Sequence, residues 1–448
     1  MRELEKAHQA DATALASLQK ERDQAKAAAE KASEELAKNP PGQNTELYQQ
    51  TKRLFVEGKI EEAIQLLDEE KLRQLDKDAK KAVENAVQPR LLKAQLLTVQ
   101  LRFKDAEKAY LRAIEIAPNS FQSNFSYASF SQSLNRYEEA RAAYGRCLEW
   151  ARKNEKDAEL ALTLNNLGNV NRDDNRPAEA RNALEEALKI RRELAQKDPE
   201  TYLGEIAGTL INLGILDRRQ NRLGEARKDF EEALKTYREL AQKAPETYMP
   251  YVAIALTNRG NVDHGPDEAR KNYEEALEIQ CQLAQKKPET YLPAMALTLN
   301  NLGVLDRAQN RPDEARKRFE GALKIRRELA QKNPEAYQPD VAQTLSNLGM
   351  LDSQNRPEEA RKELEEALKI RRELAQKNPE AYQPNVAYTL SNLGMLDKSQ
   401  NRPQEARQEF EEALQIYEAF AKQDPRQFSP NVARVKQLLA ELPNNHGP

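Results

Sequence analysis

The chain has 448 residues, of which 39% are hydrophobic and 32% are charged. Its 70 basic and 73 acidic residues leave a net charge of −3, and no run of about 18 apolar residues occurs. We therefore expect no single large apolar core, no nucleic-acid partner and no membrane partner. The first residues contain no apolar signal segment, so we expect a cytoplasmic protein.

Residues 1–39 form an N-terminal arm that is predicted to be helical. Leu15, Leu18, Ala25, Ala29 and Leu36 follow the three- and four-residue spacing of a heptad seam. The seam lasts only about three heptads and is mostly alanine, so a single helix is favoured over a short coiled coil. Weak self-association through this arm stays open. The stretch "AKNPPGQN" then marks a linker.

Residues 45–152 contain repeats of about 34 residues. Ala106 and Ala140 occupy equivalent places in "FKDAEKAYLRAI" and "YEEARAAYGRCL", and they are 34 residues apart. A weaker copy, "TKRLFVEGKIEEAIQLL", precedes them. Each copy has two runs of apolar residues at helical spacing, so each is predicted to be a pair of helices.

Residues 153–425 contain six longer repeats. Their first helices each carry one glycine, and successive glycines are 46, 46, 43, 46 and 45 residues apart. These repeat glycines are Gly168, Gly214, Gly260, Gly303, Gly349 and Gly394. Each unit is predicted to be a helix, a turn and a longer helix. In "NPEAYQP" we expect Asn-Pro to end one unit and the second proline to open the next.

The repeat glycines indicate how the helices pack. An alanine, a large apolar residue and a second alanine follow Gly303 at Ala315, Phe319 and Ala322, and the other copies keep this pattern. Glycine and alanine let helices touch while the large residue fills the remaining gap. Neither helix can bury its apolar face alone, so the fold class is predicted to be all-α, a right-handed α-solenoid of about nine helix pairs. Residues 426–448 would form a capping helix and a tail.

This pattern resembles tetratricopeptide repeats, and the six long copies resemble the kinesin-light-chain type found in bacterial proteins. The resemblance implies the solenoid fold and a protein or peptide partner. The sequence departs from the family pattern in two places: the aromatic residue three positions after the glycine is polar, and the aromatic residue before "EEA" is mostly replaced, as in "NRPDEA". An aspartate such as Asp217 or Asp306 stands three residues after the glycine, and we expect it to pair with a turn arginine such as Arg222 or Arg311. The tyrosines of "PExY" are expected to pack between repeats.

The sequence offers little chemistry for an enzyme. Its three histidines, His8, His264 and His446, lie far apart, and it has no phosphate-binding loop, nucleophile elbow or metal-spaced cluster. Cys147 replaces an alanine of the repeat and is expected to be a reduced core thiol, as Cys281 is expected to be reduced. We therefore expect no catalytic residue, no metal and no cofactor.

An asparagine stands two residues before every repeat glycine, and these six residues are called the ladder asparagines: Asn166, Asn212, Asn258, Asn301, Asn347 and Asn392. An asparagine amide matches a peptide group as both donor and acceptor, so a row of them can hold an extended peptide. Neighbouring positions on the same predicted groove are Asn165, Asn169, Met350 and Met395. Two alternatives are that the asparagines tie neighbouring helices together and that the methionines pack between repeats.

These residues predict a non-enzymatic scaffold or adaptor that binds an extended peptide, or a partner helix, in its concave groove. One alternative is a regulatory arm that controls a signalling enzyme in trans. Another is a structural spacer that self-associates through the N-terminal arm.

Overall fold

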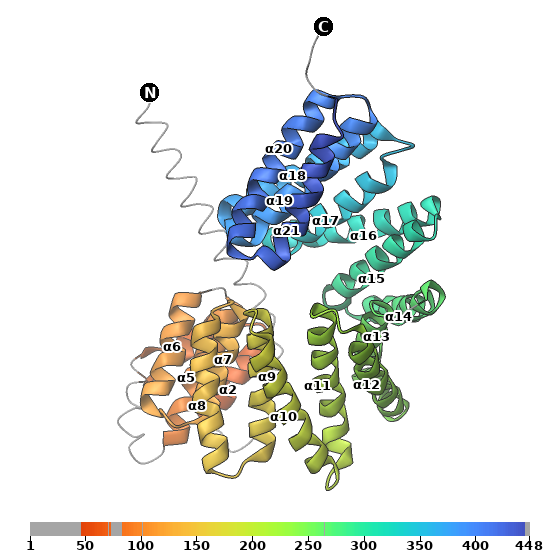
Figure 1. Cartoon of the computed structure of the whole chain (residues 1–448). Helices are drawn as coiled ribbons and strands as arrows, with labels where there is room; N and C mark the ends of the chain where they lie inside the picture. Colours follow the sequence, from red (N-terminus) through yellow and green to blue (C-terminus); the bar gives the residue numbers. More distant parts are fainter. Residues whose placement is uncertain (1–45, 70, 73–82, 101, 264, 444–448) are drawn as a thin grey trace, which may run out of the picture. The chain divides into compact units, whose positions relative to one another are not determined.

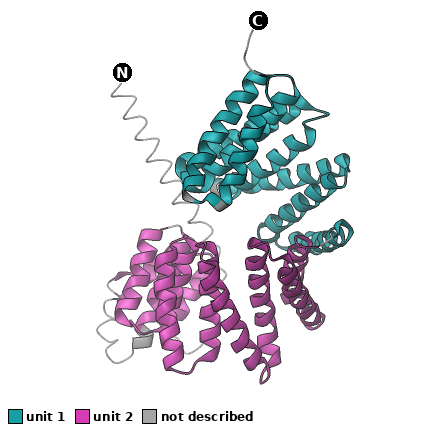
Figure 2. Cartoon of the chain, viewed as in Figure 1, with its two compact units in different colours: residues 1–20, 264–448 teal, residues 21–263 magenta. Residues whose placement is uncertain are grey.

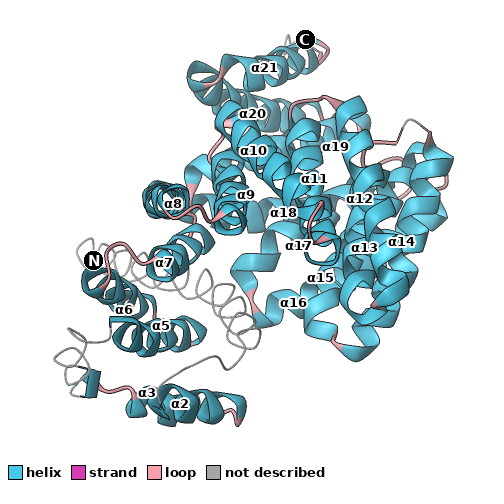
Figure 3. Cartoon of the chain, turned by 90° about the horizontal axis from the view of Figure 1, so that it is seen from below, coloured by secondary structure: helices cyan, strands magenta, loops and turns pink. Residues whose placement is uncertain are grey.

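The computed structural model describes residues 46–69, 71–72, 83–100, 102–263 and 265–443. The predicted N-terminal helix and the three histidines therefore lie outside the described residues. The described part contains 19 helices and no strand (Figure 3). These residues divide into two compact units, 46–263 and 265–443, called here the N-terminal and C-terminal units (Figure 2).

Within each unit, every helix packs mainly against its neighbours in sequence (Figure 1). The N-terminal unit contains α2 (Glu46–Val56), α3 (Ile60–Leu66), α5 (Val83–Val99), α6 (Phe103–Ile116), α7 (Phe121–Ser133), α8 (Tyr137–Lys153), α9 (Asp157–Asp173), α10 (Pro177–Ala195), α11 (Pro199–Arg219), α12 (Leu223–Lys243) and α13 (Pro245–Gly260). The C-terminal unit contains α14 (Pro266–Lys286), α15 (Pro288–Ala308), α16 (Pro312–Lys332), α17 (Pro334–Asp352), α18 (Pro357–Lys377), α19 (Pro379–Ser399), α20 (Pro403–Gln423) and α21 (Pro425–Ala440). The prediction of an all-α array of packed helix pairs is confirmed.

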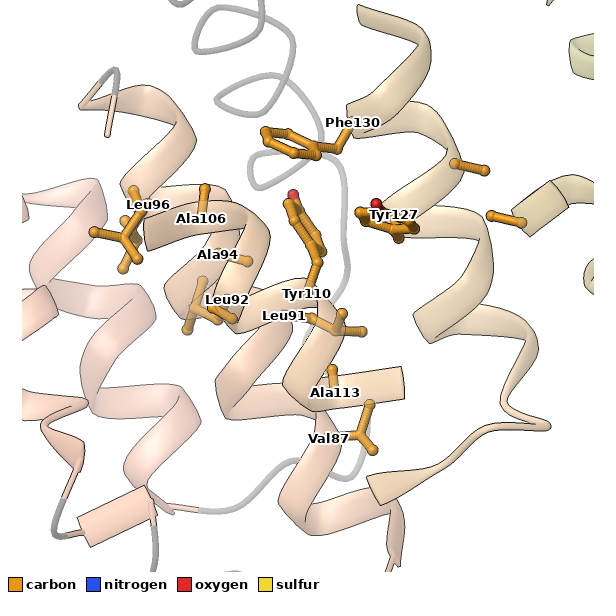
Figure 4. Close-up of a cluster of buried hydrophobic side chains, with 14 of the residues drawn as sticks. Val87, Leu91, Leu92, Ala94, Leu96, Ala106, Tyr110, Ala113, Tyr127 and Phe130 are labelled. Carbon is orange, nitrogen blue, oxygen red and sulfur yellow. The ribbon is translucent and has the colours of Figure 1, made fainter. Parts of the chain in front are cut away.

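The shorter repeats build an aromatic core. Tyr110 on α6 lies between α5 and α7, with its ring centroid 4.9 Å from that of Phe130 and 6.5 Å from that of Tyr127 (Figure 4). Leu91 and Leu92 of α5 are buried in the same cluster. Offset and tilted ring pairs at such distances add to the free energy of burial.

The longer repeats pack as their glycines predict. A Cβ atom on Gly394 would lie 2.6 Å from the ring of Phe410, and one on Gly303 would lie 2.6 Å from the ring of Phe319. No side chain fits there, so glycine lets the two helices of a repeat approach closely. Ala315 and Ala322, on either side of Phe319, are fully buried.

Asparagine closes the turn between the two helices of a long repeat. Asn221, Asn310 and Asn401 have φ of 57°, 55° and 56°, a left-handed conformation that asparagine tolerates better than most residues. The next residue returns its N–H to a carbonyl in the last turn of the helix, as Arg402 does to Asp397 O at 2.9 Å. This is the arrangement of a Schellman motif, which satisfies carbonyls at the helix end.

At "NPEAYQP" Asn333 ends α16, as expected, with its N–H 2.9 Å from Leu329 O, but the expectation that the second proline opens the next helix is wrong. Asn-Pro opens the next helix: the Asn333 side chain accepts from the N–H of Ala336, and Pro334 is the first residue of α17. Proline fits there because the first N–H groups of a helix have no partner inside it. The second proline, Pro339, lies inside α17, and the "PExY" tyrosines lie in helices and are partly buried.

Successive repeats are joined by buried ion pairs. An arginine of one long helix contacts the aspartate 36 residues later, at the end of the next repeat's first helix, in Arg181–Asp217, Arg227–Asp263, Arg270–Asp306, Arg316–Asp352 and Arg361–Asp397. Two of the expected turn pairs are present in addition, with Arg222 Nε 2.8 Å from Asp217 and Arg402 Nη1 3.9 Å from Asp397. The expected pair of Arg311 with Asp306 is not formed among the described residues, where Asp306 contacts Arg270 instead. The aspartates therefore bridge repeats as well as turns.

Candidate functional site

Each ladder asparagine shares a helix face with the residues four before it and three after it. These positions are called the ladder face. On α9 they are Leu162, Asn166 and Asn169, and on α15 they are Leu297, Asn301 and Val304. Few large apolar side chains are exposed in the described residues, and four of them lie on the ladder face: Leu162, Ile254, Leu297 and Val304. Ile254 precedes Asn258 by four residues. The ladder face therefore combines amide groups with exposed apolar side chains.

Two ladder asparagines tie neighbouring repeats together. Asn212 Nδ2 donates to Asn165 Oδ1 at 3.1 Å, which joins α11 to α9. Asn347 Nδ2 donates to Asn300 Oδ1 at 3.0 Å, which joins α17 to α15. In these two places the amides serve the alternative role of linking helices.

Three other ladder asparagines are half-buried. Asn166 and Asn258 each donate to a carbonyl one turn earlier in their own helix, at 3.2 and 3.0 Å. Asn301 lies between the exposed Leu297 and Val304. Asn169, one turn beyond Asn166, accepts from Arg172 Nη1 at 3.0 Å.

Asn392 is the exception, because it is buried without a partner for its amide N–H₂. Its side chain is 5% exposed, and Nδ2 makes no hydrogen bond to any described residue. In the preceding repeat, Ser346 occupies the place that Asn165 and Asn300 hold for Asn212 and Asn347. The Ser346 hydroxyl is shorter and donates to Ala342 O at 2.9 Å. A buried donor without a partner costs roughly 1–3 kcal/mol, so Asn392 gains if a ligand supplies an acceptor.

Asn392 lines a small recess formed by α19, α20 and α21, which is called the C-terminal recess. Its volume is about 40 Å³, which suits the end of one side chain rather than a cofactor. The lining residues are Tyr388, Ser391, Asn392, Met395, Tyr417, Asn431, Arg434, Val435 and Leu438. Arg434 is the one charged side chain among them.

The two predicted methionines take part in packing around this recess. The Tyr388 hydroxyl donates to Met350 Sδ at 3.3 Å, which connects α19 to α17. Met395 is partly buried against the apolar cluster of the last helices, and its sulfur lies 4.0 Å from Arg434 Nη2. Both contacts are between repeats, as the packing alternative expects.

A buried arginine lies against the ring of Tyr388, one of the residues that line the C-terminal recess. Arg371 on α18 is 3% exposed, and its Nη1 donates to Asn385 O at 3.1 Å and to Thr389 Oγ1 at 2.6 Å. Its guanidinium carbon lies 5.6 Å from the ring centre of Tyr388. Burial lowers the pKa of Arg371 to about 10, and burial raises the pKa of Tyr417.

The sequence pattern identified Asn392 and Met395 but missed the other walls of this recess. Tyr388 could have been found, because it lies four residues before Asn392 on the same helix. Tyr417, Asn431 and Arg434 come from the following helices, and their positions depend on how those helices pack.

A second recess, about 620 Å³ in volume, lies among α3, α5 and α6 in the N-terminal unit. Its charged groups are largely engaged with each other: Lys93 contacts Glu69 at 2.7 Å and Arg102 contacts Asp105 at 2.9 Å. The buried Arg90 donates to the carbonyls of Ala86 and Leu72. Basic residues outnumber acidic ones in this lining, but the acidic side chains and the buried arginine are already engaged within the protein.

The described residues contain no group of His, Cys, Asp and Glu side chains arranged to hold a metal ion. None of the helices described is both long and apolar enough to cross a bilayer. Both cysteines are free thiols, and burial raises the pKa of Cys147 to about 12.

Comparison with known proteins agrees with this architecture. One tetratricopeptide repeat model matches residues 119–193, 251–328 and 372–419, and a second matches 206–243 and 341–379, so together they span more than half of the chain. The crystal structure of the apo form of RapI is similar over 84% of this chain and 98% of RapI, with 16% identity and a TM-score of 0.53, which shows a shared fold.

Two further structures are similar over shorter lengths. BtubC (BKLC) from P. vanneervenii is 23% identical over 53% of this chain and 89% of its own, with a TM-score of 0.41. A tetratricopeptide repeat protein from Parabacteroides merdae ATCC 43184 is 14% identical over 62% of this chain and 92% of its own, with a TM-score of 0.38. No curated protein matches the chain.

Proposed function

Because the chain belongs to the tetratricopeptide repeat family, we propose that it is a non-enzymatic scaffold that binds an extended peptide segment of a partner protein along its ladder face. A partner helix is the other form the ligand can take. The free thiols Cys147 and Cys281 fit a reducing, cytoplasmic compartment. Weak self-association through the N-terminal arm remains part of the proposal.

The observation that carries the proposal is the unpartnered amide of Asn392. Its Nδ2 is buried and has no acceptor, whereas the amides of Asn212 and Asn347 are already used between helices. A peptide carbonyl is an acceptor of the right kind, and each extended peptide offers a row of them. Asn392 is therefore the ladder asparagine best placed to hold a ligand.

Exposed apolar side chains on the ladder face can contact the apolar side chains of a bound peptide. Leu297 and Val304 are 45% and 38% exposed, and they flank Asn301 by one turn on either side. Monomeric proteins expose such residues singly and without consequence, but here they recur next to an amide donor. An extended peptide can place apolar side chains on Leu297 and Val304 while its backbone faces the asparagine.

Selection of random 12-residue peptides displayed on phage, against the full chain, tests the proposal. The affinity of synthetic copies of the selected peptides is then measured by fluorescence anisotropy. We expect Asn392→Ala, or Leu297→Ser with Val304→Ser, to weaken binding at least tenfold. The matched control is Asn212→Ala, which removes an amide that is already engaged with Asn165 and should leave the affinity within twofold.

Circular dichroism first establishes that each variant is folded. Peptides that bind every variant equally would place the binding surface elsewhere, and the proposal would be wrong. Failure to select any peptide from the random library would also count against it.

A further inference from the structure

The recess among α3, α5 and α6, called here the N-terminal recess, carries an excess of basic side chains. Five of its lining residues are basic and three are acidic. The basic residues are Arg90, Lys93, Arg102, Lys108 and Arg112. None of the lining residues belongs to the ladder face, so the recess is separate from the surface assigned to peptide binding.

Each carboxylate of the lining already has a cation beside it. Lys93 Nζ lies 2.7 Å from Glu69, and Arg102 Nη2 lies 2.9 Å from Asp105. Asp68 accepts from the backbone N–H of Lys71 at 2.8 Å, and the ammonium group of Lys71, which is outside the lining, lies 3.6 Å from its carboxylate. The acidic residues are therefore neutralised, and the recess as a whole stays positive.

Two of the basic residues, Lys108 and Arg112, lie one turn apart on the same face of α6. Lys108 is exposed, and no described residue forms a hydrogen bond or an ion pair with it. The Arg112 side chain is about half exposed, and its Nη1 lies 2.7 Å from Glu115, outside the recess. Like charges at this spacing destabilise a helix slightly. An anion bound between them would turn this repulsion into attraction.

The long repeats carry the opposite charge at the position of Arg112, which stands six residues after Ala106. Six residues after the corresponding alanine, five of the six long repeats have a glutamate: Glu186, Glu232, Glu275, Glu366 and Glu412. Four of these glutamates accept from an arginine of the preceding second helix, as Glu232 does from Arg192 at 2.7 Å. Ion pairs therefore join consecutive second helices in the long repeats, whereas next to α3 this position adds a cation.

The size and the other walls of the recess suit a small organic anion. Its volume of about 620 Å³ lies in the range of small-molecule sites. Arg90 is buried and fixed in place, because its Nη1 and Nη2 donate to Ala86 O and Leu72 O at 3.1 and 2.9 Å. Apolar surface comes from Ile64 and Leu97. A phosphate monoester matches such a site, because it carries nearly two negative charges and three acceptor oxygens.

We propose that the N-terminal recess binds a phosphate monoester. Lys108 and Arg112 contact the phosphate oxygens from α6, Lys93 contributes a cation from α5, and Arg90 supplies fixed positive charge within the recess. The apolar walls accept the organic part of the ligand. That ligand is either a free organic phosphate or a phosphorylated side chain of a partner protein, and the experiment separates the two. The inference is independent of peptide binding on the ladder face.

The test follows the phosphorus NMR line width of three probes as the full chain is added: inorganic phosphate, phenyl phosphate and a phosphoserine tripeptide with glycine on either side and blocked ends. Binding to a chain of this size broadens the phosphate resonance, and the titration gives a dissociation constant. For a free organic phosphate we expect phenyl phosphate to bind most tightly, and for a phosphorylated side chain we expect the tripeptide to do so. If none of the three resonances broadens, the proposal is wrong.

The decisive variants are Arg112→Glu, which gives this repeat the acid of the long repeats, and Lys108→Gln. Both side chains reach solvent, so we expect circular dichroism to show that the variants fold like the unmodified chain. Each should weaken binding of the tightest probe about tenfold or more, the effect of losing a hydrogen bond to a charged group. The matched control is Lys104→Gln, which removes an exposed lysine one turn earlier on α6, outside the lining, and should leave the affinity within about twofold.

Equal weakening by Lys104→Gln and Lys108→Gln would mean that the probe responds to net charge alone, and the proposed site would be wrong. Unchanged affinity in both Arg112→Glu and Lys108→Gln would place the phosphate elsewhere on the chain and would also overturn the proposal. Neither result would affect the proposed function, because these variants leave the ladder face as it is.

Discussion

The partly buried carboxyl of Glu409 makes the stability of the C-terminal unit depend on pH. Glu409 lies on α20, immediately before Phe410, which packs on Gly394. Burial raises the pKa of Glu409 from 4.5 to about 7, the nearby Arg361 lowers it, and Glu365, Glu405 and Glu412 raise it further. Its Oε2 makes no hydrogen bond to a described residue.

The direction in which stability changes with pH depends on whether the folded or the unfolded chain holds the Glu409 proton more tightly. Between pH 4.5 and pH 7 the folded chain holds the Glu409 proton and the unfolded chain releases it, so stability falls as the pH rises through this window. For a fully buried carboxyl, such a change in pKa lowers the free energy of unfolding by roughly 3 kcal/mol above pH 7. Glu409 is only partly buried and water screens its charge, so we expect about half of this, ~1.5 kcal/mol.

The variant Glu409→Gln keeps the shape of the side chain and cannot ionise. At pH 8 we expect it to raise the midpoint of thermal unfolding by roughly 3–6 °C. At pH 4.5 we expect almost no difference, because Glu409 is then protonated in the folded chain. The measurement is thermal unfolding followed by circular dichroism, with Glu411→Gln, an exposed glutamate on the same helix, as the control. A gain of equal size at both pH values, or no gain at pH 8, would refute the argument.

Two further predictions concern packing and the ion pairs between repeats. Gly394→Ala places a Cβ 2.6 Å from the ring of Phe410 and should destabilise the C-terminal unit by about 1–3 kcal/mol, whereas Gly321→Ala, whose Cβ meets Leu299 at an ordinary 3.6 Å, should stabilise it by up to ~1 kcal/mol. Urea unfolding that ranks the two alanine variants in the opposite order would contradict this packing. Asp306→Asn leaves Arg270 without its buried partner and should cost about 3 kcal/mol in the same assay. A cost under about 1 kcal/mol would mean that Glu274 and Gln309, which also contact Arg270, compensate it.

Much of the architecture could be predicted from the sequence because the contacts within a repeat are short-range. Gly303 and Phe319 are 16 residues apart, and the helical periods on either side of the turn bring them together, as they do Gly214 with Phe230 and Gly394 with Phe410. The one local error concerns the second proline. Asn333 ends α16 and also begins α17, where its side chain accepts from Ala336 N–H, so Pro339 lies inside the helix instead of opening it.

The candidate site could be predicted only in part, for a physical reason. The six ladder asparagines are alike in sequence, and identical residues at a repeated position suggest identical roles. Their roles differ because each depends on the residue that the preceding repeat presents: Asn300 accepts from Asn347, but Ser346 does not reach Asn392. The way one helix pair stacks on the next determines which residues of neighbouring repeats meet.

The sequence by itself therefore determined the helix pairs, their turns and the close packing inside each repeat, because these follow from helical periodicity over fewer than 20 residues. The tertiary structure alone decided the Arg–Asp pairs 36 residues apart, the unpartnered amide of Asn392 and the recess that Tyr417 and Arg434 complete. Those features depend on the offset between neighbouring helices, and side-chain packing between repeats sets that offset.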